Sequence, residues 1–427
     1  MRVRLHNIGP LHEADVEFGP LTVLVGPNGS GKTTFTSVSY ALLRAHAYAM
    51  RIALGALENP FDFESERKPN PALGREIVDE WQGAFTRRLG FELRRCCSPD
   101  LSMLARARRG GKNAAPRIEM AASSWSMVFR LSGDDLWLET EHECYRRPKL
   151  RLPRKGTPLE ARRALRKTLL DDVPRKGVYF PAGRSALVQT HSALNSLMAA
   201  ALSGGYFEDA TIGSIPGVTA DFMQLVAQLS VKRRGKGLPG VARKLERNLL
   251  HGRVRIDESS GGKEILFRPE GHDDEWPIEN VATSVAELSS LALYLRNLAR
   301  PGDAIVIDEP ESHLHAESQV VLATALAELA YRLPPVIVAT HSEFLVSAFS
   351  NLLLEQSRTG KQKDQRPIAL SVHEFSFRKD DHGLGVDVHL IDVKPTEGFE
   401  IKQISAVSDR VFGDSVTLYN RLHSPES

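Results

Sequence analysis

The chain uses little cysteine. Its 427 residues include three cysteines, Cys96, Cys97 and Cys144. They contain no Cys-x-x-Cys pair, so their spacing supports neither a disulfide framework nor a zinc motif. Such sparing use of cysteine is typical of proteins in a reducing compartment. We therefore expect a cytoplasmic protein whose thiols are ordinary unpaired side chains.

Long apolar runs are also absent from the sequence. No segment approaches the roughly 18 consecutive apolar residues that a membrane-spanning helix needs. The longest candidate, at residues 197–202, is far too short. The first residues alternate apolar and polar side chains as a strand does, and they lack the apolar core of a signal peptide. We expect no membrane partner.

A large excess of one charge is missing too, because the formal net charge is +2. This balance hides an asymmetry, since residues 51–177 hold 26 Lys or Arg against 18 Asp or Glu. The basic residues are densest at 146–155 and 162–167. This segment could contact the phosphates of a nucleic acid or form a solvated basic surface. Both interpretations stay open, because no helix-turn-helix or aromatic-interleaved motif accompanies the charge.

A phosphate-binding motif is present near the start of the chain. Residues 26–34 match the pattern G-x-x-x-x-G-K-[ST]. They follow an apolar run at 21–25 and precede a helix-like stretch at 35–44. In that context the backbone N–H groups and the helix N-terminus surround a phosphate. The residues that we predict to bind the nucleotide are Gly26, Pro27, Asn28, Gly29, Ser30, Gly31, Lys32, Thr33 and Thr34.

Four kinds of residue in this loop have different tasks. Lys32 would reach the β- and γ-phosphates, and the Thr33 hydroxyl would bind Mg²⁺. Gly29 and Gly31 let the backbone close around phosphate oxygens, and Asn28 tolerates unusual dihedral angles at the tip. The motif therefore predicts a nucleoside triphosphate held together with Mg²⁺.

Two carboxylates follow an apolar run later in the chain. Residues 304–307 are apolar and lead into Asp308 and Glu309. In an open parallel sheet, ligands bind at the carboxyl ends of the strands. Asp308 would hold Mg²⁺, and Glu309 would polarise the attacking water. The pattern is weak alone and becomes strong with a phosphate loop upstream.

A histidine follows the next apolar run, at residues 336–339. The imidazole of His341 would meet the γ-phosphate or order the catalytic water, or it is a polar residue that opens a turn. His313 and His315 could be grouped with His341 as a metal cluster. We do not favour that interpretation, because no third ligand has the spacing of a metal site.

The order of these runs predicts an α/β fold. Residues 3–8 and 14–18 alternate around turns and indicate a β-hairpin before the phosphate loop. A helix-like stretch at 318–332 joins the apolar runs at 304–307 and 336–339. This βαβ arrangement indicates a parallel sheet.

The domain organisation follows from where this order breaks down. We predict a head formed by residues 1–50 and 178–427, with a basic inserted subdomain at 51–177. The second part of the head opens on an apolar strand and a Pro/Gly turn that projects Arg184. Arg184 is either a phosphate or relay residue or a surface arginine.

Taken together, the head resembles the ATP-binding-cassette (ABC) ATPases of the RecF, SMC and OLD (overcoming lysogenization defect) group. The resemblance is carried by residues 8–14, the phosphate loop, the run Asp-Glu-Pro-Glu-Ser-His-Leu-His at 308–315, and residues 339–342. It implies a P-loop NTPase fold with a mixed or parallel sheet behind an N-terminal β-hairpin. It also implies hydrolysis of ATP to ADP and phosphate with Mg²⁺.

The resemblance further implies a homodimer in which two heads enclose two ATP molecules. Each phosphate loop would face the signature segment of the other protomer. The best candidate for that segment is residues 280–288, which open a helix. Ser284 or Thr283 would touch the partner's γ-phosphate. No glycine follows the serine, and this departs from the Ser-Gly-Gly pattern of the family.

OLD-type proteins carry a nuclease domain after the ATPase, and we expect no counterpart of it in the residues that follow His341. About 85 residues follow His341, without a paired-carboxylate nuclease motif. We therefore expect a separate effector, a nuclease or a toxin, and a dimeric switch of the anti-phage defence type that senses nucleic acid or an invader. The alternative is a RecF-like ATPase of DNA repair or chromosome maintenance. A nucleotide-binding subunit of a transporter is less favoured, because the Ser-Gly-Gly signature is absent.

Overall fold

The computed structural model describes most of the chain, as eleven segments separated by gaps. These segments are 1–57, 71–105, 115–152, 158–170, 172–191, 193, 215–231, 237–258, 263–359, 369–380 and 383–423. Among these residues, eleven strands join into one sheet in the order β6-β5-β4-β1-β2-β14-β13-β3-β12-β11-β7. Its strands are β1 (Arg2–Ile8), β2 (Leu11–Glu17), β3 (Leu21–Val25), β4 (Arg117–Ala121), β5 (Ser126–Ser132), β6 (Asp135–Leu138), β7 (Lys176–Phe180), β11 (Asp303–Asp308), β12 (Val336–Thr340), β13 (Leu370–Asp380) and β14 (Gly383–Ile391).

The sheet has a parallel half and an antiparallel half. Strands β13, β3, β12, β11 and β7 run parallel to one another. Strand β14 joins the two halves, antiparallel to β13 and parallel to β2. Strands β2, β1, β4, β5 and β6 are antiparallel. The α/β fold with a mixed sheet is therefore confirmed. The predicted N-terminal hairpin is confirmed as β1–β2, which pairs Ile8 with Leu11 across the turn.

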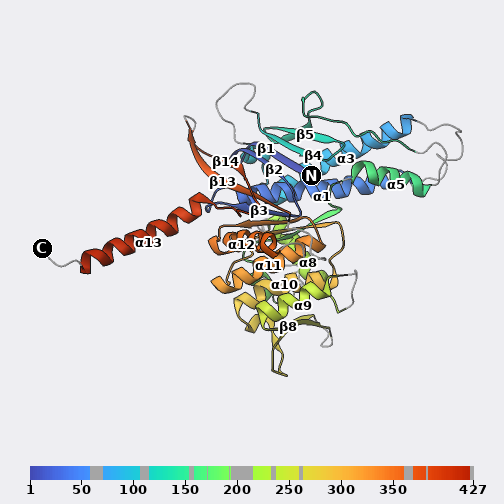
Figure 1. Ribbon diagram of the computed structural model, residues 1–427. Coiled ribbons are helices and arrows are strands. Elements are labelled where there is room, and N and C mark those ends of the chain that lie inside the picture. Colours follow the sequence, from blue (N-terminus) through green and yellow to red (C-terminus); the bar gives the residue numbers. More distant parts are fainter. Residues whose placement is uncertain are drawn as a thin grey trace, which may run out of the picture.

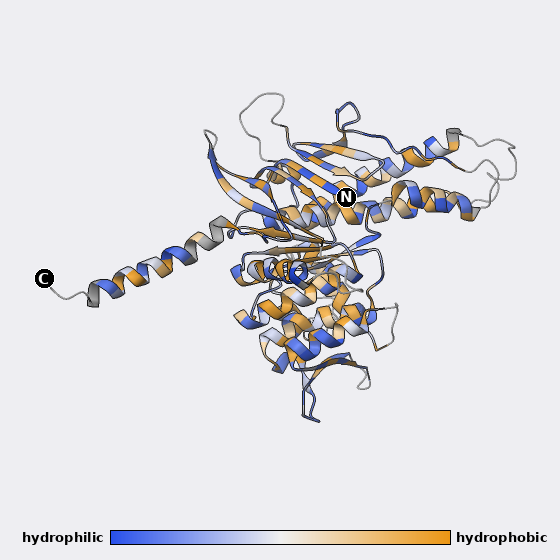
Figure 2. Ribbon diagram, in the orientation of Figure 1, coloured by the Kyte–Doolittle hydropathy of each residue, from blue (hydrophilic) through white to orange (hydrophobic). Residues whose placement is uncertain are grey.

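The central parallel strands β3, β11 and β12 are mostly apolar because both of their faces are buried. In β3, Val23 belongs to one hydrophobic core and Leu24 to the other. The same alternation continues in β11, where Ile305 and Val306 face opposite cores. A strand that is covered on both sides loses the apolar–polar alternation of a half-exposed strand. Figure 2 shows this as apolar residues gathered in the middle of the molecule.

Helices cover the two faces of the sheet in separate groups (Figure 1). The first group packs on the face of the sheet to which Leu24 and Val306 point. It consists of α1 (Lys32–Gly55), α3 (Pro71–Cys96), α4 (Leu101–Leu104) and α5 (Pro158–Leu169). The second group lies on the other side: α6 (Arg184–Gln189), α8 (Gly217–Gln228), α9 (Pro239–Leu245), α10 (Thr283–Asn297), α11 (Ala316–Arg332) and α12 (Glu343–Thr359). The βαβ prediction is confirmed, because α11 joins the parallel pair β11 and β12.

A small sheet lies at the far end of the second helix group. Its strands are β8 (Gly252–Asp257), β9 (Glu264–Pro269) and β10 (Trp276–Pro277), in the order β10-β9-β8. The π-helical turn η2 (Glu246–Leu250) joins α9 to this sheet, and the 3₁₀ turn η3 (Ile278–Asn280) leaves it. Figure 1 shows β8 at the opposite end of the molecule from α3 and α5.

The described residues of the segment 51–177 share the sheet and the core of the head. The predicted boundary at 50/51 falls inside α1, and the boundary at 177/178 falls inside β7. Strand β4 pairs with β1, so β4, β5 and β6 extend the large sheet. The apolar residues that fix this segment are widely spaced, for example Trp81 and Trp125 with ring centroids 5.1 Å apart. Short local patterns cannot reveal such packing between distant residues.

The last helix, α13 (Lys402–His423), projects from the body (Figure 1). It exposes several large apolar side chains, among them Phe412 and Tyr419. Of the helices that the structure describes, none combines the length and the apolar character that crossing a bilayer requires.

Candidate nucleotide-binding site

The predicted phosphate loop connects β3 to α1, and two of its glycines are required by packing. Gly31 has a φ of 84°, and a Cβ on it would lie 2.7 Å from Cγ of Pro10 in the β1–β2 turn. A Cβ on Gly26 would lie 2.5 Å from the carbonyl oxygen of Phe375 in β13. Any larger residue would push the loop away from these neighbours. The motif predicted the glycines, but it could not show which distant segments press on them.

Lys32 is the first residue of α1 and is 7% exposed. Its ammonium donates hydrogen bonds to the carbonyl oxygens of Gly26, at 2.7 Å, and Pro27, at 2.9 Å. Burial lowers the pKa of Lys32, while the negative charges of Glu309, Glu311 and Asp308 oppose that shift. The cation therefore lies within the loop, in the field of the acidic strand end.

Asp308 is the last residue of β11 and is 2% exposed. The hydroxyl of Tyr179 donates to its Oδ2 at 2.5 Å, and the hydroxyl of Thr36 donates to its Oδ1 at 3.1 Å. Thr33 adds a further hydrogen bond. Burial raises the pKa of Asp308, and these three hydrogen bonds act against that rise. The structure thus brings Thr33 and Asp308 together, as predicted for the two magnesium ligands.

Tyr179 and Thr36 were not predicted as site residues. Tyr179 belongs to β7, where it looks like one more apolar residue of a buried strand. Thr36 lies three residues after Thr33 in α1, so helical spacing could have placed both threonines on one face. Their hydroxyls orient the Asp308 carboxylate.

Glu309 directly follows β11 and leaves the strand geometry. Its φ is 44°, a left-handed conformation that costs a non-glycine residue about 1–3 kcal/mol. A hydrogen bond from its N–H to the carbonyl oxygen of Ala339, at 2.8 Å, holds the turn. Its Oε1 lies 3.6 Å from Nδ1 of His341, and the two side chains are 37% and 43% exposed. The predicted pair of catalytic residues is therefore close together and open to solvent.

Glu311 was not predicted as a site residue, yet it supports His341. Glu311 is 5% exposed, and its Oε1 accepts hydrogen bonds from the Thr340 hydroxyl at 2.6 Å and the His341 N–H at 3.0 Å. The same oxygen lies 3.5 Å from Nδ1 of His341. Glu311 therefore fixes the end of β12, the point from which His341 extends.

A pocket of about 620 Å³ opens over this acidic edge. Its lining residues come from the turn after β7, the loop after β11, helix α11, the end of β12 and the start of α12. They are Gly183, Glu309, Glu311, Ser312, His313, Leu314, Gln319, His341, Ser342, Glu343 and Phe344. The pocket is polar and carries three carboxylates.

Arg184 is buried and is not a surface arginine. It is 1% exposed and forms an ion pair with Glu287 of α10 at 2.9 Å. It also donates to the carbonyl oxygen of Asp308 at 2.9 Å. Burial lowers the pKa of Arg184, and the charge of Glu287 opposes that shift. Arg184 therefore joins the end of β11 to helix α10.

Ser284 lies in the first turn of the same helix, which begins at Thr283. It is partly exposed, and Thr283 is exposed. Glu287, which pairs with the buried Arg184, lies one turn further along α10. Within the described residues, Ser284 is thus connected to Asp308 through its helix rather than by direct contact.

These contacts define a P-loop nucleotide-binding head. The family comparison agrees: residues 2–42 match the model of an AAA domain. Residues 221–347 match a model described as "AAA domain, putative AbiEii toxin, Type IV TA system". Two separate segments of the chain are therefore similar to AAA domains. No curated protein matches the chain.

Several solved structures of SMC head domains are similar in shape. One is an SmcHead bound to the C-winged helix domain of ScpA, with 16% identity, a TM-score of 0.43, and coverage of 91% of this chain and 97% of that one. A second is an Smc head with an extended coiled coil bound to the C-terminal domain of ScpA derived from Pyrococcus furiosus, with 13% identity, a TM-score of 0.42, and coverage of 91% and 96%. A third is the SMC head domain from Thermotoga maritima, with 11% identity, a TM-score of 0.38, and coverage of 92% and 98%.

Proposed function

We propose that this protein binds ATP with Mg²⁺, hydrolyses it, and uses the reaction to switch a homodimer. One observation carries the proposal. The carboxyl ends of β3, β11 and β12 form one edge, and this edge carries Lys32, Asp308 and the pair Glu309–His341. A cation, an ion-binding carboxylate and a candidate base at one strand edge are the groups that phosphoryl transfer to water needs.

The described residues fit a nucleotide with its metal ion. Ser30 in the loop has a buried hydroxyl oxygen without a hydrogen-bond partner among the described residues. Thr33 and Asp308 supply the oxygen ligands that Mg²⁺ prefers. The bound ion would neutralise phosphate charge, and it would also offset the negative charge of the buried Asp308.

Glu309 and His341 would act on the water side of the site. The Glu309 carboxylate is placed to accept a proton from an attacking water, and His341 is placed to orient that water. Glu311 would act through His341 as a positioning residue, because it holds the backbone from which the imidazole extends.

The open acidic pocket supports a site that a second copy of the chain completes. Ser284 would enter the partner's site. A movement of α10 on binding would then be transmitted to the end of β11, because Arg184 pairs with Glu287 of α10 and donates to the carbonyl oxygen of Asp308. The description of the matched AAA domain as a putative toxin-system component supports a defence-type role. In that role a separate nuclease or toxin would be the effector. The RecF-like alternative predicts ATP-dependent binding to gapped DNA.

A complementation experiment tests the shared site. Lys32→Ala disables a phosphate loop, and Ser284→Arg disables a signature segment, so each variant alone should hydrolyse no ATP. In a mixture, half of the dimers combine one of each and regain one complete site. Activity should return to about a quarter of the wild-type rate, as expected for twofold symmetry.

The two parts of the proposal fail differently. If the wild-type protein hydrolyses no ATP, the proposed reaction is wrong. If Ser284→Arg retains full activity, or if mixing restores none, the enclosed-dimer arrangement is wrong while the ATPase assignment stands. Wild-type mixed with Lys32→Ala is the control for simple dilution.

A further inference from the structure

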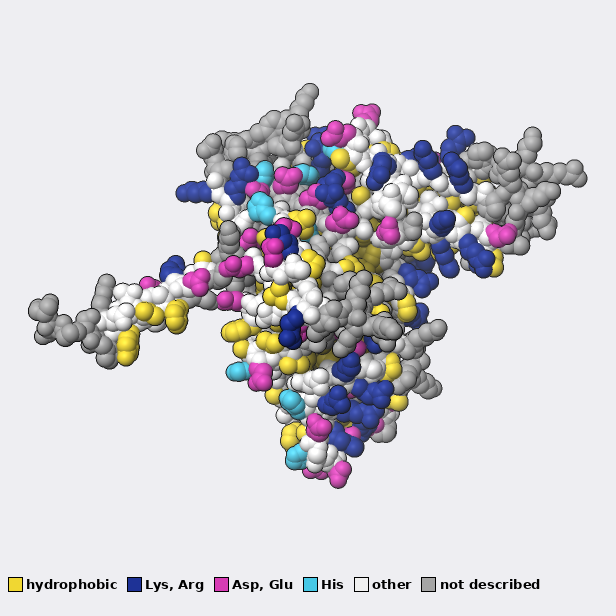
Figure 3. Space-filling view, viewed as in Figure 1, with side chains coloured by type: hydrophobic (Ala, Val, Ile, Leu, Met, Phe, Trp, Pro, Cys, Tyr) yellow, Lys and Arg dark blue, Asp and Glu magenta, His cyan; other side chains and the backbone are white. Residues whose placement is uncertain are grey.

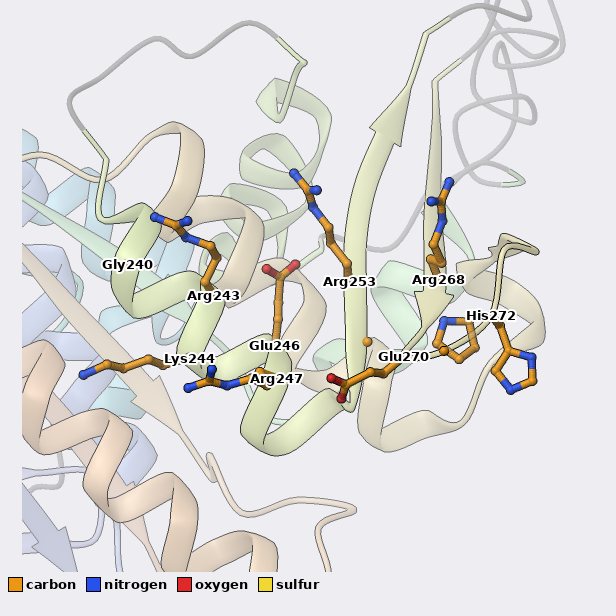
Figure 4. A pocket seen from close by; sticks show the side chains of 12 residues that line it. Gly240, Arg243, Lys244, Glu246, Arg247, Arg253, Arg268, Glu270 and His272 are labelled. Carbon is orange, nitrogen blue, oxygen red and sulfur yellow. The ribbon is translucent and has the colours of Figure 1, made fainter.

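A second pocket, of about 700 Å³, lies between the α9–η2 helix and the β8–β9 hairpin (Figure 4). It shares no lining residue with the pocket over Glu309. Five basic side chains line it: Arg243, Lys244 and Arg247 from the helix, and Arg253 and Arg268 from the hairpin. His272 adds an imidazole from the turn after β9. We call this set of residues the basic pocket.

Two arginines of the basic pocket face each other across the hairpin. In the β8–β9 register, Arg253 is the direct partner of Arg268. Like charges directly opposite each other destabilise an antiparallel pair. Figure 4 shows both side chains and that of Arg243 extending toward the same side of the pocket. An arrangement that is unfavourable alone becomes favourable when an anion lies between the guanidinium groups.

Neighbouring carboxylates neutralise only part of this charge. Glu246 faces the pocket from the helix, but it is buried and forms an ion pair with Arg296 behind it. Glu275 pairs with Arg268 at 2.8 Å. Outside the lining, Glu328 pairs with Lys244 at 2.7 Å.

Three arginines remain without such a partner. Within the described residues, no carboxylate forms an ion pair with Arg243, Arg247 or Arg253, and Glu270 is the remaining acidic side chain of the lining. All three arginines are exposed. The basic pocket therefore presents uncompensated positive charge from two different elements.

We propose that the basic pocket binds the phosphate backbone of a nucleic acid. The planar guanidinium group matches a phosphate with two parallel hydrogen bonds. Arginines on a helix and on a hairpin suit successive phosphates of a chain better than one isolated phosphate. The lining contains no Phe, Tyr or Trp on which a base could stack, so the pocket contacts the backbone without reading sequence.

The lining also argues against an acidic protein as the ligand. Protein interfaces are held by apolar or aromatic anchors near their centre. Apart from the ring of Pro269 and the imidazole of His272, the residues that line the basic pocket are charged residues and glycines. Phosphate charge alone is sufficient for a nucleic acid.

The basic pocket and the basic segment at 51–177 are different surfaces. Figure 3 shows Lys and Arg gathered over the lower part of the molecule, where α9 and β8 lie, and again along the extension of α3 and α5. On α5, Arg166 and Lys167 are exposed basic residues. Residues 153–155 of the basic run predicted at 146–155 lie outside the described residues.

Two double variants with the same loss of charge test the proposal. Arg247→Ala/Arg253→Ala removes charge from the basic pocket, and Arg166→Ala/Lys167→Ala removes it from α5. Fluorescence anisotropy would follow binding of single-stranded DNA, duplex DNA and RNA of one mixed sequence, over a range of salt concentrations. We expect the pocket variant to bind on the order of tenfold more weakly, with a salt slope lower by about two. The α5 variant should bind like wild type.

The remaining outcomes decide against the proposal. Equal weakening in both variants would show that general charge, not the pocket, drives binding. Unchanged binding in the pocket variant would exclude the site. Stronger competition by poly-glutamate than by DNA would identify an acidic protein as the ligand. Arg247→Lys/Arg253→Lys keeps the positive charge and serves as the matched control. An unchanged melting temperature of the Ala variants excludes misfolding. ATP hydrolysis, measured on the same samples, separates a failure of this proposal from a failure of the proposed function.

Discussion

Asp308 and Glu309 are neighbours in sequence, yet their surroundings differ sharply. Asp308 is 2% exposed and receives hydrogen bonds from Tyr179 and Thr36. Glu309 is 37% exposed and faces His341 across 3.6 Å. The strand ends between them, because Glu309 adopts a left-handed backbone conformation. One carboxylate is thus fixed by the fold, whereas the other faces an open pocket.

This difference separates two tasks within one site. The proposed ion-binding side, around Asp308, is already assembled by α1, β7 and β11. The proposed water side, around Glu309 and His341, is exposed and loosely paired. We infer that binding of a second copy or of the nucleotide completes the exposed side, while the buried side stays unchanged.

The largest expected effect tests the exposed side. Glu309→Gln keeps the size of the side chain but cannot accept a proton, so the rate of ATP hydrolysis should fall about 10²- to 10⁴-fold. ATP affinity, measured by calorimetry, should stay within a few-fold. Glu317→Gln, an exposed glutamate in the first turn of α11, is the matched control and should keep full activity. Undiminished hydrolysis in Glu309→Gln would falsify its role as the base.

On the buried side we expect a large loss of stability. Arg184→Met leaves Glu287 buried without its partner, which should lower the free energy of unfolding by about 3–5 kcal/mol. Urea unfolding would measure it. Arg184→Met/Glu287→Leu should recover most of that loss, because it removes both charges.

The exposed pair of Arg147 and Asp79 is the control for this prediction. Arg147→Met should cost less than about 1 kcal/mol, as surface ion pairs do. A similarly small loss in Arg184→Met would show that burial does not set the value of the ion pair.

The sequence predicted the buried side only in part. A local motif identifies Lys32 and Thr33, and an apolar run identifies Asp308. The hydroxyls of Tyr179 and Thr36 were not predicted as partners of Asp308, because β7 and α1 are far from Asp308 in the sequence and come close to it only in the folded chain. Arg184 was left open for the same reason, since its partner Glu287 is 103 positions away. The described strands of 51–177 were assigned to a separate subdomain, because their pairing partner β1 lies at the start of the chain.

Burial of a titratable group also makes the stability of the fold depend on pH, and His46 is a residue at which this can be measured. His46 belongs to α1 and packs against the aromatic rings of Trp81 and Trp125, and burial lowers its pKa to about 4. The unfolded chain has the ordinary value of about 6.5, so it takes up a proton first as the pH falls. Stability should therefore be full above about pH 6.5 and decrease toward pH 4, by about 3 kcal/mol from this group.

Urea unfolding of His46→Phe between pH 7 and pH 4 would check this prediction. The stability of the variant should no longer show that part of the pH dependence. The variant also loses the hydrogen bond to the carbonyl oxygen of Leu169, which lowers stability at every pH. Phe85→Leu, in the same aromatic group, is the control and should lower stability equally at every pH. The same pH slope in wild type and His46→Phe would contradict the assignment.

The smallest effect is expected from a comparison of two tyrosine–aspartate hydrogen bonds, one buried and one part-buried. Tyr179 donates to Asp308 at 2.5 Å, and Tyr40 donates to Asp221 at 2.9 Å, away from the strand edge. Tyr179→Phe and Tyr40→Phe should each lower the free energy of unfolding by about 2 kcal/mol, because each removes a hydrogen bond to a carboxylate. Only Tyr179→Phe should also change the Mg²⁺ concentration that gives half-maximal hydrolysis, since only Asp308 is proposed to hold the ion. An equal change in both variants would mean that general stability controls metal binding; a change in neither would mean that the Tyr179 hydroxyl does not tune the ion-binding carboxylate.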